Sequence, residues 1–251
     1  MIEMLNLKII LVCIALLILV VFENIFPKEI IKFKTKIKRT LKNIFLWLLN
    51  IGLTPILILP LTIAATSLNL HNYFIIEHTI AQFLFHLIIY DIFLYFWHRA
   101  NHEIPFLWRF HHVHHLDETL DVSSGIRFHF GEVILSAIVR CVIIITFNIS
   151  LFNLILIEAI VLSSSVFHHS NIKLPTKFEK ILSFIIVTPS IHWVHHHKRQ
   201  KETDANYCAI FSFWDLIFGT RSNFKRYKGM PIGVEGDKEQ NLIKLISRPL
   251  K

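Results

Sequence analysis

The histidines of this chain are grouped in a way that suits metal binding. Six of the 16 histidines fall in the 18 residues between His98 and His115. His98 and His102 are four residues apart, and His111, His114 and His115 follow the spacing i, i+3, i+4, so on a helix each group lies on one face. Neutral imidazole is a good ligand for iron, zinc and copper.

A later group repeats the i, i+3, i+4 spacing with His192, His195 and His196. Taken alone, an i, i+4 pair can be incidental on an exposed helix, and one HxxHH block can be a solvated basic face. Three such groups in one chain favour a shared site instead. We therefore expect the groups to converge on metal.

Long apolar segments must position these histidines. Hydrophobic residues make up 53% of the 251 residues, and the mean hydropathy is +0.53, which indicates an integral membrane protein. The three cysteines, Cys13, Cys141 and Cys208, form neither a CxxC site nor a disulfide framework. The expected fold class is all-α: a membrane helical bundle with a cytoplasmic helical cap that holds a histidine-rich dimetal site.

Five apolar segments are predicted, at residues 5–26, 44–66, 79–97, 133–149 and 151–165. The first is expected to be a retained transmembrane helix, because no small-x-small cleavage site follows Phe22. Pro55 and Pro60 should kink the second. The last two are short for full spans of roughly 20 residues, so two spans and a re-entrant pair both stay open.

The distribution of basic residues predicts the orientation. Seven Lys and Arg lie in residues 28–42, none lie in residues 67–78, and 24 of the 26 lie in segments that this topology places inside. The positive-inside rule then places every histidine group on the cytoplasmic side. Because topology accounts for the basic charge, we expect a membrane partner and no nucleic acid.

We treat residues 1–251 as a single membrane domain. Within it we expect an N-terminal helix and basic linker (1–43), a catalytic core (44–220) and a C-terminal tail (221–251).

Six motifs lie between about residue 91 and residue 220. They are Trp97-His98-Arg99-Ala100-Asn101-His102; Trp108 to His115; Arg127, His129 and Glu132; Phe167, His169 and Asn171; Pro189, His192, His195 and His196; and Asn206-Tyr207 with Trp214 to Thr220. In these motifs the chain resembles the fatty-acid hydroxylase/sterol desaturase superfamily of membrane non-haem di-iron oxygenases. It departs at Ser165, where members often have His or Gln, and at Cys208, where Gly often follows Asn-Tyr.

The resemblance implies two iron ions, with O2 as co-substrate, and zinc could replace iron in a purified sample. The implied ligands are His98, His102, His111, His114, His115, His129, His169, His192, His195 and His196. The neighbouring His112, His168 and His197 have no counterpart in the motifs and are expected outside the ligand set.

Three carboxylates are candidates to support these ligands. Ligand histidines usually donate their second N–H to a carboxylate or a carbonyl. Asp91 precedes His98 by seven residues, Glu132 lies in the RxHxxE motif and Asp215 lies in the closing motif. A carboxylate inside a membrane span is costly, although Asp91 could instead pair with an Arg or with backbone groups.

By the same resemblance, the protein would hydroxylate or desaturate a fatty acyl, sterol-like or ether lipid drawn from the bilayer. The sequence carries no GxGxxG or other cofactor fingerprint, so electrons would come from a separate ferredoxin, cytochrome b5-like protein or reductase. One alternative is a histidine-rich membrane protein that transports or stores metal without oxygenase activity. A transporter would place its ligands along a path near mid-bilayer. A second is an inactive lipid-binding relative.

Overall fold

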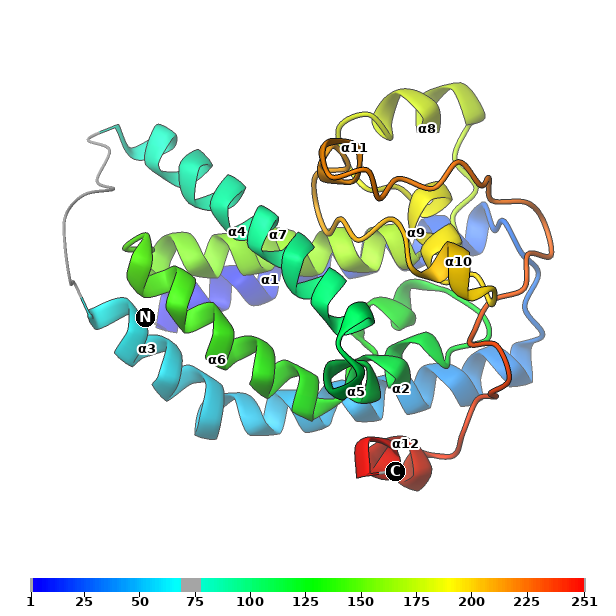
Figure 1. Cartoon of the computed structure of the whole chain (residues 1–251), viewed down its shortest axis with the longest axis horizontal. Coiled ribbons are helices and arrows are strands. Elements are labelled where there is room, and N and C mark those ends of the chain that lie inside the picture. The colour runs from blue at the N-terminus through cyan, green and yellow to red at the C-terminus, as the bar shows by residue number, and fades with distance from the viewer. Residues whose placement is uncertain (1, 69–77, 251) are drawn as a thin grey trace.

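The computed structural model describes residues 2–68 and 78–250, without the side chains of residues 2–7. The described residues form helices and loops but no β-strand, as predicted (Figure 1). The longer helices are α1 (Ile2–Ile25), α2 (Phe33–Leu53), α3 (Leu59–Ser67), α4 (Thr79–Glu103), α5 (Pro105–His115), α6 (Phe130–Thr146) and α7 (Leu151–His169). The short ones are α8 (Thr176–Leu182), α9 (Pro189–His195), α10 (Gln200–Thr203), α11 (Trp214–Ile217), α12 (Leu242–Ser247) and the turns η1 (Thr54–Ile58), η2 (Val122–Ile126) and η3 (Arg248–Leu250).

Four helical segments are long and apolar enough to cross a membrane, by length and composition. They are Lys8–Ile25, Phe33–Ser67, Thr79–Glu103 and Leu151–His169. The last apolar segment of the sequence thus continues to His169 and is longer than predicted. Its partner α6, with 17 residues, is not among the four, so whether this pair spans the bilayer stays a prediction.

The second membrane segment is helical throughout, with a π-helical turn between α2 and α3. α2 passes through the π-helical turn η1 into α3, and Pro55 stands at the start of that turn. Proline lacks an N–H and disturbs the regular α-helical ladder, which explains why the predicted irregularity occurs here. The basic segment at residues 28–42 is mostly helical, because α2 begins at Phe33.

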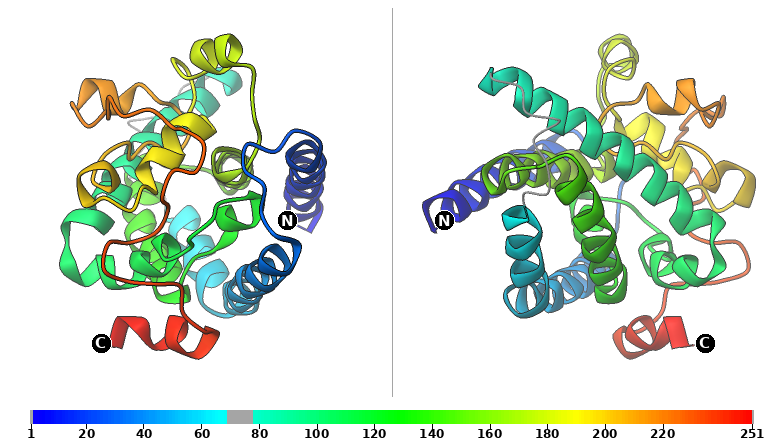
Figure 2. Two further views of the ribbon diagram at one scale, coloured as in Figure 1. Left: turned by 90° about the vertical axis from the view of Figure 1, so that its right-hand side faces the viewer. Right: turned by 60° about the vertical axis from the view of Figure 1, so that its left-hand side comes forward.

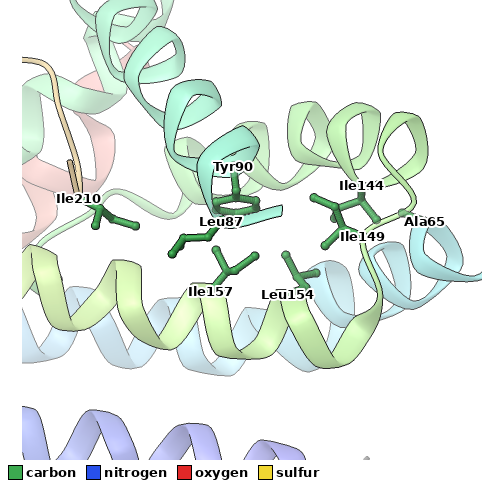
Figure 3. Packing of buried hydrophobic residues seen from close by; sticks show 8 residues of the cluster. All are labelled: Ala65, Leu87, Tyr90, Ile144, Ile149, Leu154, Ile157 and Ile210. Carbon is green, nitrogen blue, oxygen red and sulfur yellow. The ribbon is translucent and has the colours of Figure 1, made fainter. Parts of the chain in front are cut away.

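The apolar core lies where the membrane helices cross. Ala65 of α3, Leu87 and Tyr90 of α4, and Leu154 and Ile157 of α7 pack together within one cluster (Figure 3). Other faces of the helices expose large apolar side chains, which a bilayer would cover. α1 packs against α7, and Figure 2 shows α1 at the edge of the molecule in both views.

The short helices α8 to α11 gather at one end of the long helices (Figure 1). α4 and α7 both reach this end with their C-termini, where His102 and His169 stand. α4 stops at Glu103 and α5 begins at Pro105, because the residue before a proline is disfavoured in the helical conformation. The predicted cap over the histidines is therefore present. The side of the membrane on which it lies stays a prediction, and residues 69–77 of the predicted external loop lie outside the described residues.

Candidate metal centre

The histidines converge in two adjacent groups. The first contains His98 and His102 of α4, His111 and His115 of α5, and His195 of α9; the second contains His114, His169, His192 and His196. Within each group the candidate ligand nitrogens lie within 4.8 Å of one another. The structure thus brings together nine of the ten imidazoles that the motifs implied.

Each HxxHH block contributes to both groups. On α5, His111 and His115 face the first group while His114 faces the second. The later block does the reverse: His195 belongs to the first group, and His192 and His196 to the second. The 3.6-residue period makes this division possible, because positions i and i+4 share a face from which i+3 is displaced. The groups are also in direct contact, since the rings of His115 and His196 stack with centroids 4.2 Å apart.

The first group presents buried nitrogen atoms that have no protein partner. Nε2 of His102, His111, His115 and His195 is buried and makes no hydrogen bond to any described residue. An unsatisfied buried polar atom is costly, and native structures keep few of them. A metal ion at their meeting point would satisfy all four lone pairs at once, so these residues fit the metal that the motifs imply.

The Nε2 atoms of the second group also lack a suitable partner. Nε2 of His169 lies 3.0 Å from Nε2 of His114, 2.9 Å from that of His192 and 3.2 Å from that of His196. Where Nδ1 carries the proton, each Nε2 is an acceptor, and acceptors cannot satisfy one another. A cation among them resolves the conflict.

Hydrogen bonds on the outer side of the rings set their orientation. Four Nδ1 atoms donate to backbone carbonyls: His98 to Tyr207 (2.8 Å), His114 to Arg127 (3.0 Å), His169 to Ser165 (2.7 Å) and His195 to Ala205 (2.7 Å). A carbonyl accepts only, so each of these Nδ1 atoms carries the proton and each Nε2 is left with a free lone pair toward the centre.

Two further rings donate to carboxylates. Nδ1 of His111 lies 2.8 Å from Oε1 of Glu132, the contact expected of a supporting acid. Nδ1 of His102 lies 3.3 Å from Oδ1 of Asp204. Sequence reasoning missed Asp204, which follows α10 and carries no motif signal.

The other two predicted supports, Asp91 and Asp215, form no hydrogen bond with a histidine ring. Asp91 accepts from the backbone N–H groups of Ile210 (3.0 Å) and Phe211 (3.1 Å) and from Nε1 of Trp214 (2.9 Å). It forms no hydrogen bond with a histidine of either group, so the structure favours the alternative pairing with backbone groups, and its support of His98 stays a prediction. The reason is that the loop after Cys208 packs against this face of α4.

Asp215 supports a ligand through one intermediate. Its Oδ1 accepts from the N–H of Tyr207 at 2.8 Å and from Oγ1 of Thr220 at 2.7 Å. The carbonyl of Tyr207 in turn accepts from His98. Oδ2 of Asp215 also accepts from the N–H of Cys208 at 3.3 Å, which belongs to the same peptide group as that carbonyl. The closing motif therefore holds the peptide that orients His98.

His129 lies outside both groups, so the structure does not place this predicted ligand at the centre. Its Nε2 donates to the carbonyl of Ile246 at 3.0 Å, and its Nδ1 accepts from the N–H of Gly131 at 3.0 Å as the N-cap of α6. Both nitrogens are thereby occupied, and the ring stands at a helix start instead of facing the metals.

The three histidines expected outside the ligand set do lie outside the two groups. His112 contacts Nε of Arg248, and His197 accepts from the N–H of Arg199 at 2.8 Å. His168 is buried with its ring centroid 3.9 Å from that of His192. Ser165, at the position where the motif often has His or Gln, donates its hydroxyl to the carbonyl of Gly125 at 2.9 Å.

Burial keeps the cap histidines neutral. Desolvation lowers the pKa of His114, His115, His192, His195 and His196 well below the usual value, and the neighbouring imidazoles lower it further. A neutral ring is the form that binds a metal ion. These groups therefore have the right protonation state without any rearrangement.

A cavity of about 370 Å³ begins at the histidines and extends between the membrane helices. His98, His111, His114, His169 and His192 form one end of its lining. Most of the wall is apolar and includes Trp47, Ile58, Leu94, Ile126, Phe128 and Leu162. This shape suits a hydrocarbon chain that reaches the metal groups from the bilayer.

Comparison with known proteins agrees with the site. A family model described as fatty acid hydroxylase matches residues 83–220, more than half of the chain. The chain is 29% identical over 190 residues to ornithine lipid hydroxylase OlsE of Rhizobium tropici, which covers 75% of this chain and 56% of that protein. No solved structure matches.

Two other relatives match over shorter regions. Alkylglycerol monooxygenase of Danio rerio is 32% identical over 130 residues, 52% of this chain and 28% of that protein. Cholesterol 25-hydroxylase of Mus musculus is 24% identical over 147 residues, 53% of this chain and 44% of that protein. The matched regions therefore span about half or less of these relatives.

Proposed function

Because the chain belongs to the fatty acid hydroxylase family, we propose that it is a membrane oxidoreductase that uses O2 to hydroxylate or desaturate a lipid. The observation that carries the proposal is the convergence of nine imidazoles into two adjacent groups at the end of an apolar cavity. Neither a transporter nor an inactive scaffold needs two complete ligand groups at one end of a lipid-sized cavity.

We assign the metal ligands to the two groups and leave out His129. The first ion would be held by His98, His102, His111, His115 and His195, and the second by His114, His169, His192 and His196. We propose iron in both positions, which supplies the O2 chemistry that oxidation of an unactivated C–H bond requires. Zinc binds such ligands more tightly than ferrous iron and would compete during purification.

The protein's own contribution is to hold ligands and substrate. Glu132 and Asp204 fix the rings of His111 and His102, and the backbone carbonyls fix four others. The apolar cavity excludes water and aligns a hydrocarbon chain beside the rings, which lowers the entropic cost of bringing a chosen C–H bond to the metals. Hydroxylation and desaturation need the same arrangement.

The substrate class follows only coarsely from the relatives. Their names specify an ornithine lipid, an alkylglycerol and cholesterol, and these substrates share an apolar body rather than a headgroup. We propose a fatty acyl, sterol-like or ether lipid as the substrate class, because an apolar body matches the mainly apolar wall of the cavity.

A basic surface near the cap is a candidate for docking an electron donor, which we propose to be a separate acidic carrier such as a ferredoxin or a cytochrome b5-like protein. Arg199, Lys201, Lys225 and Lys228 are exposed there. Arg226, in the same segment, is instead stacked 3.6 Å over the ring of Trp193. The positive charge also supports the cytoplasmic orientation of the cap.

The decisive experiment compares lipids from cells that express the chain and its variants. Wild-type protein should give a lipid that has gained one oxygen or one double bond, and His115→Ala and His195→Ala should each abolish it. His112→Ala is the matched control, because His112 lies in the same block but outside both groups. If oxidation survives both ligand changes, the proposed activity is wrong.

A further inference from the structure

The far end of the apolar cavity carries a cluster of charged residues that the metal chemistry does not use. Lys8, Tyr90, Arg140 and Glu158 line the same cavity as the histidines. Nζ of Lys8 lies 2.5 Å from Oε2 of Glu158, and Nη1 of Arg140 lies 2.8 Å from Oε1 of the same carboxylate. Nη1 of Arg140 also donates to the hydroxyl of Tyr90 at 3.1 Å.

The cluster lies among the candidate membrane spans. Glu158 stands near the middle of Leu151–His169, Tyr90 lies within Thr79–Glu103, and Lys8 is the first residue of Lys8–Ile25. Charged residues within membrane spans are expensive and tend to serve function. The side chains of Lys8 and Arg140 are 27% and 15% exposed, so a molecule in the cavity can reach them.

The charges of the cluster do not balance. Two cations share one carboxylate, and among the side chains that the structure describes, Glu158 is the only acid that forms an ion pair with either of them. One positive charge is therefore left over in an apolar environment. A partly buried charge without a full counter-charge is unfavourable, and an anion bound beside it would reduce the penalty.

Along both α4 and α7, this cluster is separated from the metal groups by a few helical turns. Tyr90 precedes His98 by eight residues on α4, and Glu158 precedes His169 by eleven on α7. With a rise of roughly 1.5 Å per residue, these separations are about 12 Å and about 16 Å. The wall between the two ends is mainly apolar.

We infer that the Lys8–Glu158–Arg140 cluster binds an oxyanion, a carboxylate or a phosphate, at one end of the lipid substrate. The inference rests on the proposed function and narrows its substrate class to lipids that carry such a group. Arg140 and Lys8 contact the anion, and Tyr90 and Glu158 position the guanidinium and the ammonium. The hydrocarbon chain then runs along the apolar wall, and its oxidised carbon lies remote from the anion.

The test measures binding alone. Purified, metal-loaded protein is kept under nitrogen without an electron donor, so that no oxidation takes place, and cis-parinaric acid serves as a fluorescent probe. Dodecanoate, dodecyl phosphate and dodecanol compete for the site. We expect at least one of the two anions to displace the probe from wild-type protein at a concentration about tenfold or more below that of dodecanol. Which anion does so identifies the source of the oxyanion.

The variants assign the preference to the cluster. Lys8→Gln should reduce the ratio of the displacing concentration of dodecanol to that of the anion by about tenfold. Lys34→Gln alters an exposed cation of α2 outside the cavity and should leave this ratio unchanged. Because Lys8 is partly exposed, this change is milder than one at Arg140, and metal content checks that the fold is kept. Equal displacement by dodecanol and both anions in wild-type protein, or an unchanged ratio in Lys8→Gln, overturns the inference. The two proposals can fail separately. If the protein shows no preference for anions, the proposed oxidation can still be correct, and if it oxidises no lipid, the measured preference for anions still stands.

Discussion

Nδ1 of His111 lies 2.8 Å from Oε1 of Glu132, a contact that joins the start of α6 to the first histidine group. Both side chains are buried. The N–H at Nδ1 donates to the carboxylate and leaves Nε2 free to face the other rings. This pair is the most direct structural support for a metal ligand that the sequence motifs had indicated.

Replacing Glu132 should weaken the metal centre without removing a ligand. We expect Glu132→Gln to lower metal affinity or turnover by about 10- to 100-fold, because the amide holds His111 less firmly and makes it a poorer donor to the metal. Metal content after dialysis and product formation measure the change. Glu103→Gln serves as the control, since Glu103 forms only an exposed pair with Arg99. Equal metal retention in both variants would contradict the assigned role.

His129 and His169 should behave differently although both occur in the family motifs. His129→Ala should keep both metals and lose roughly 0.5–2 kcal/mol of stability, because it removes the cap of α6. His169→Ala should lose the metal of the second group. Metal analysis and thermal unfolding of the two purified variants distinguish these outcomes, and loss of metal from His129→Ala would restore it to the ligand set.

Asp91 should matter for stability more than for metal binding. Asp91→Asn exchanges a carboxylate that accepts three N–H bonds for an amide with one acceptor oxygen. We expect a loss of about 1–3 kcal/mol, measured as a lower unfolding temperature. The metal-to-protein ratio of the folded fraction should stay at the wild-type value. A selective loss of metal from protein with unchanged thermal stability would show that Asp91 supports a ligand after all.

Removal of metal should destabilise the whole cap. A chelator leaves the buried Nε2 atoms of His102, His111, His115 and His195 without partners, and a metal that binds only the folded state stabilises it by mass action. We expect a lower unfolding temperature after chelation and recovery when ferrous iron is returned under nitrogen. His115→Ala should show a much smaller response to the chelator. An unfolding temperature that does not respond in wild-type protein would argue against a metal at these groups.

Local sequence patterns predicted much of the fold because their physical causes are local. Continuous apolar segments can only be satisfied in a bilayer or a core, which is why four of the five predicted segments overlap the candidate spans Lys8–Ile25, Phe33–Ser67, Thr79–Glu103 and Leu151–His169. The start of the second differs most, because basic residues before residue 44 also form part of α2. Proline disturbs a helix or starts one because it lacks an N–H. Pro55 stands in the π-helical turn η1, and Pro105 begins α5. The i, i+3, i+4 spacing of His111, His114 and His115 fixes which side of one turn each ring occupies.

Contacts between distant elements were beyond these patterns. Asp204 follows α10 without any motif, yet it reaches His102 because α9 and α10 fold back over the end of α4. Asp91 shares a helix face with His98, but the loop that follows Cys208 packs on that face and takes up its oxygens. Spacing along one helix does not reveal what the neighbouring helix offers.

The sequence by itself determined that this chain is a membrane protein of helices and that its histidine blocks are suited to metal, because hydrophobicity and helical periodicity act over a few turns. Only the tertiary structure decided how the rings divide into two groups, why His129 stands apart at the start of α6, and that Lys8, Arg140 and Glu158 meet in the cavity. Those outcomes depend on how side chains from separate helices pack in space, and no periodicity within one helix carries that information.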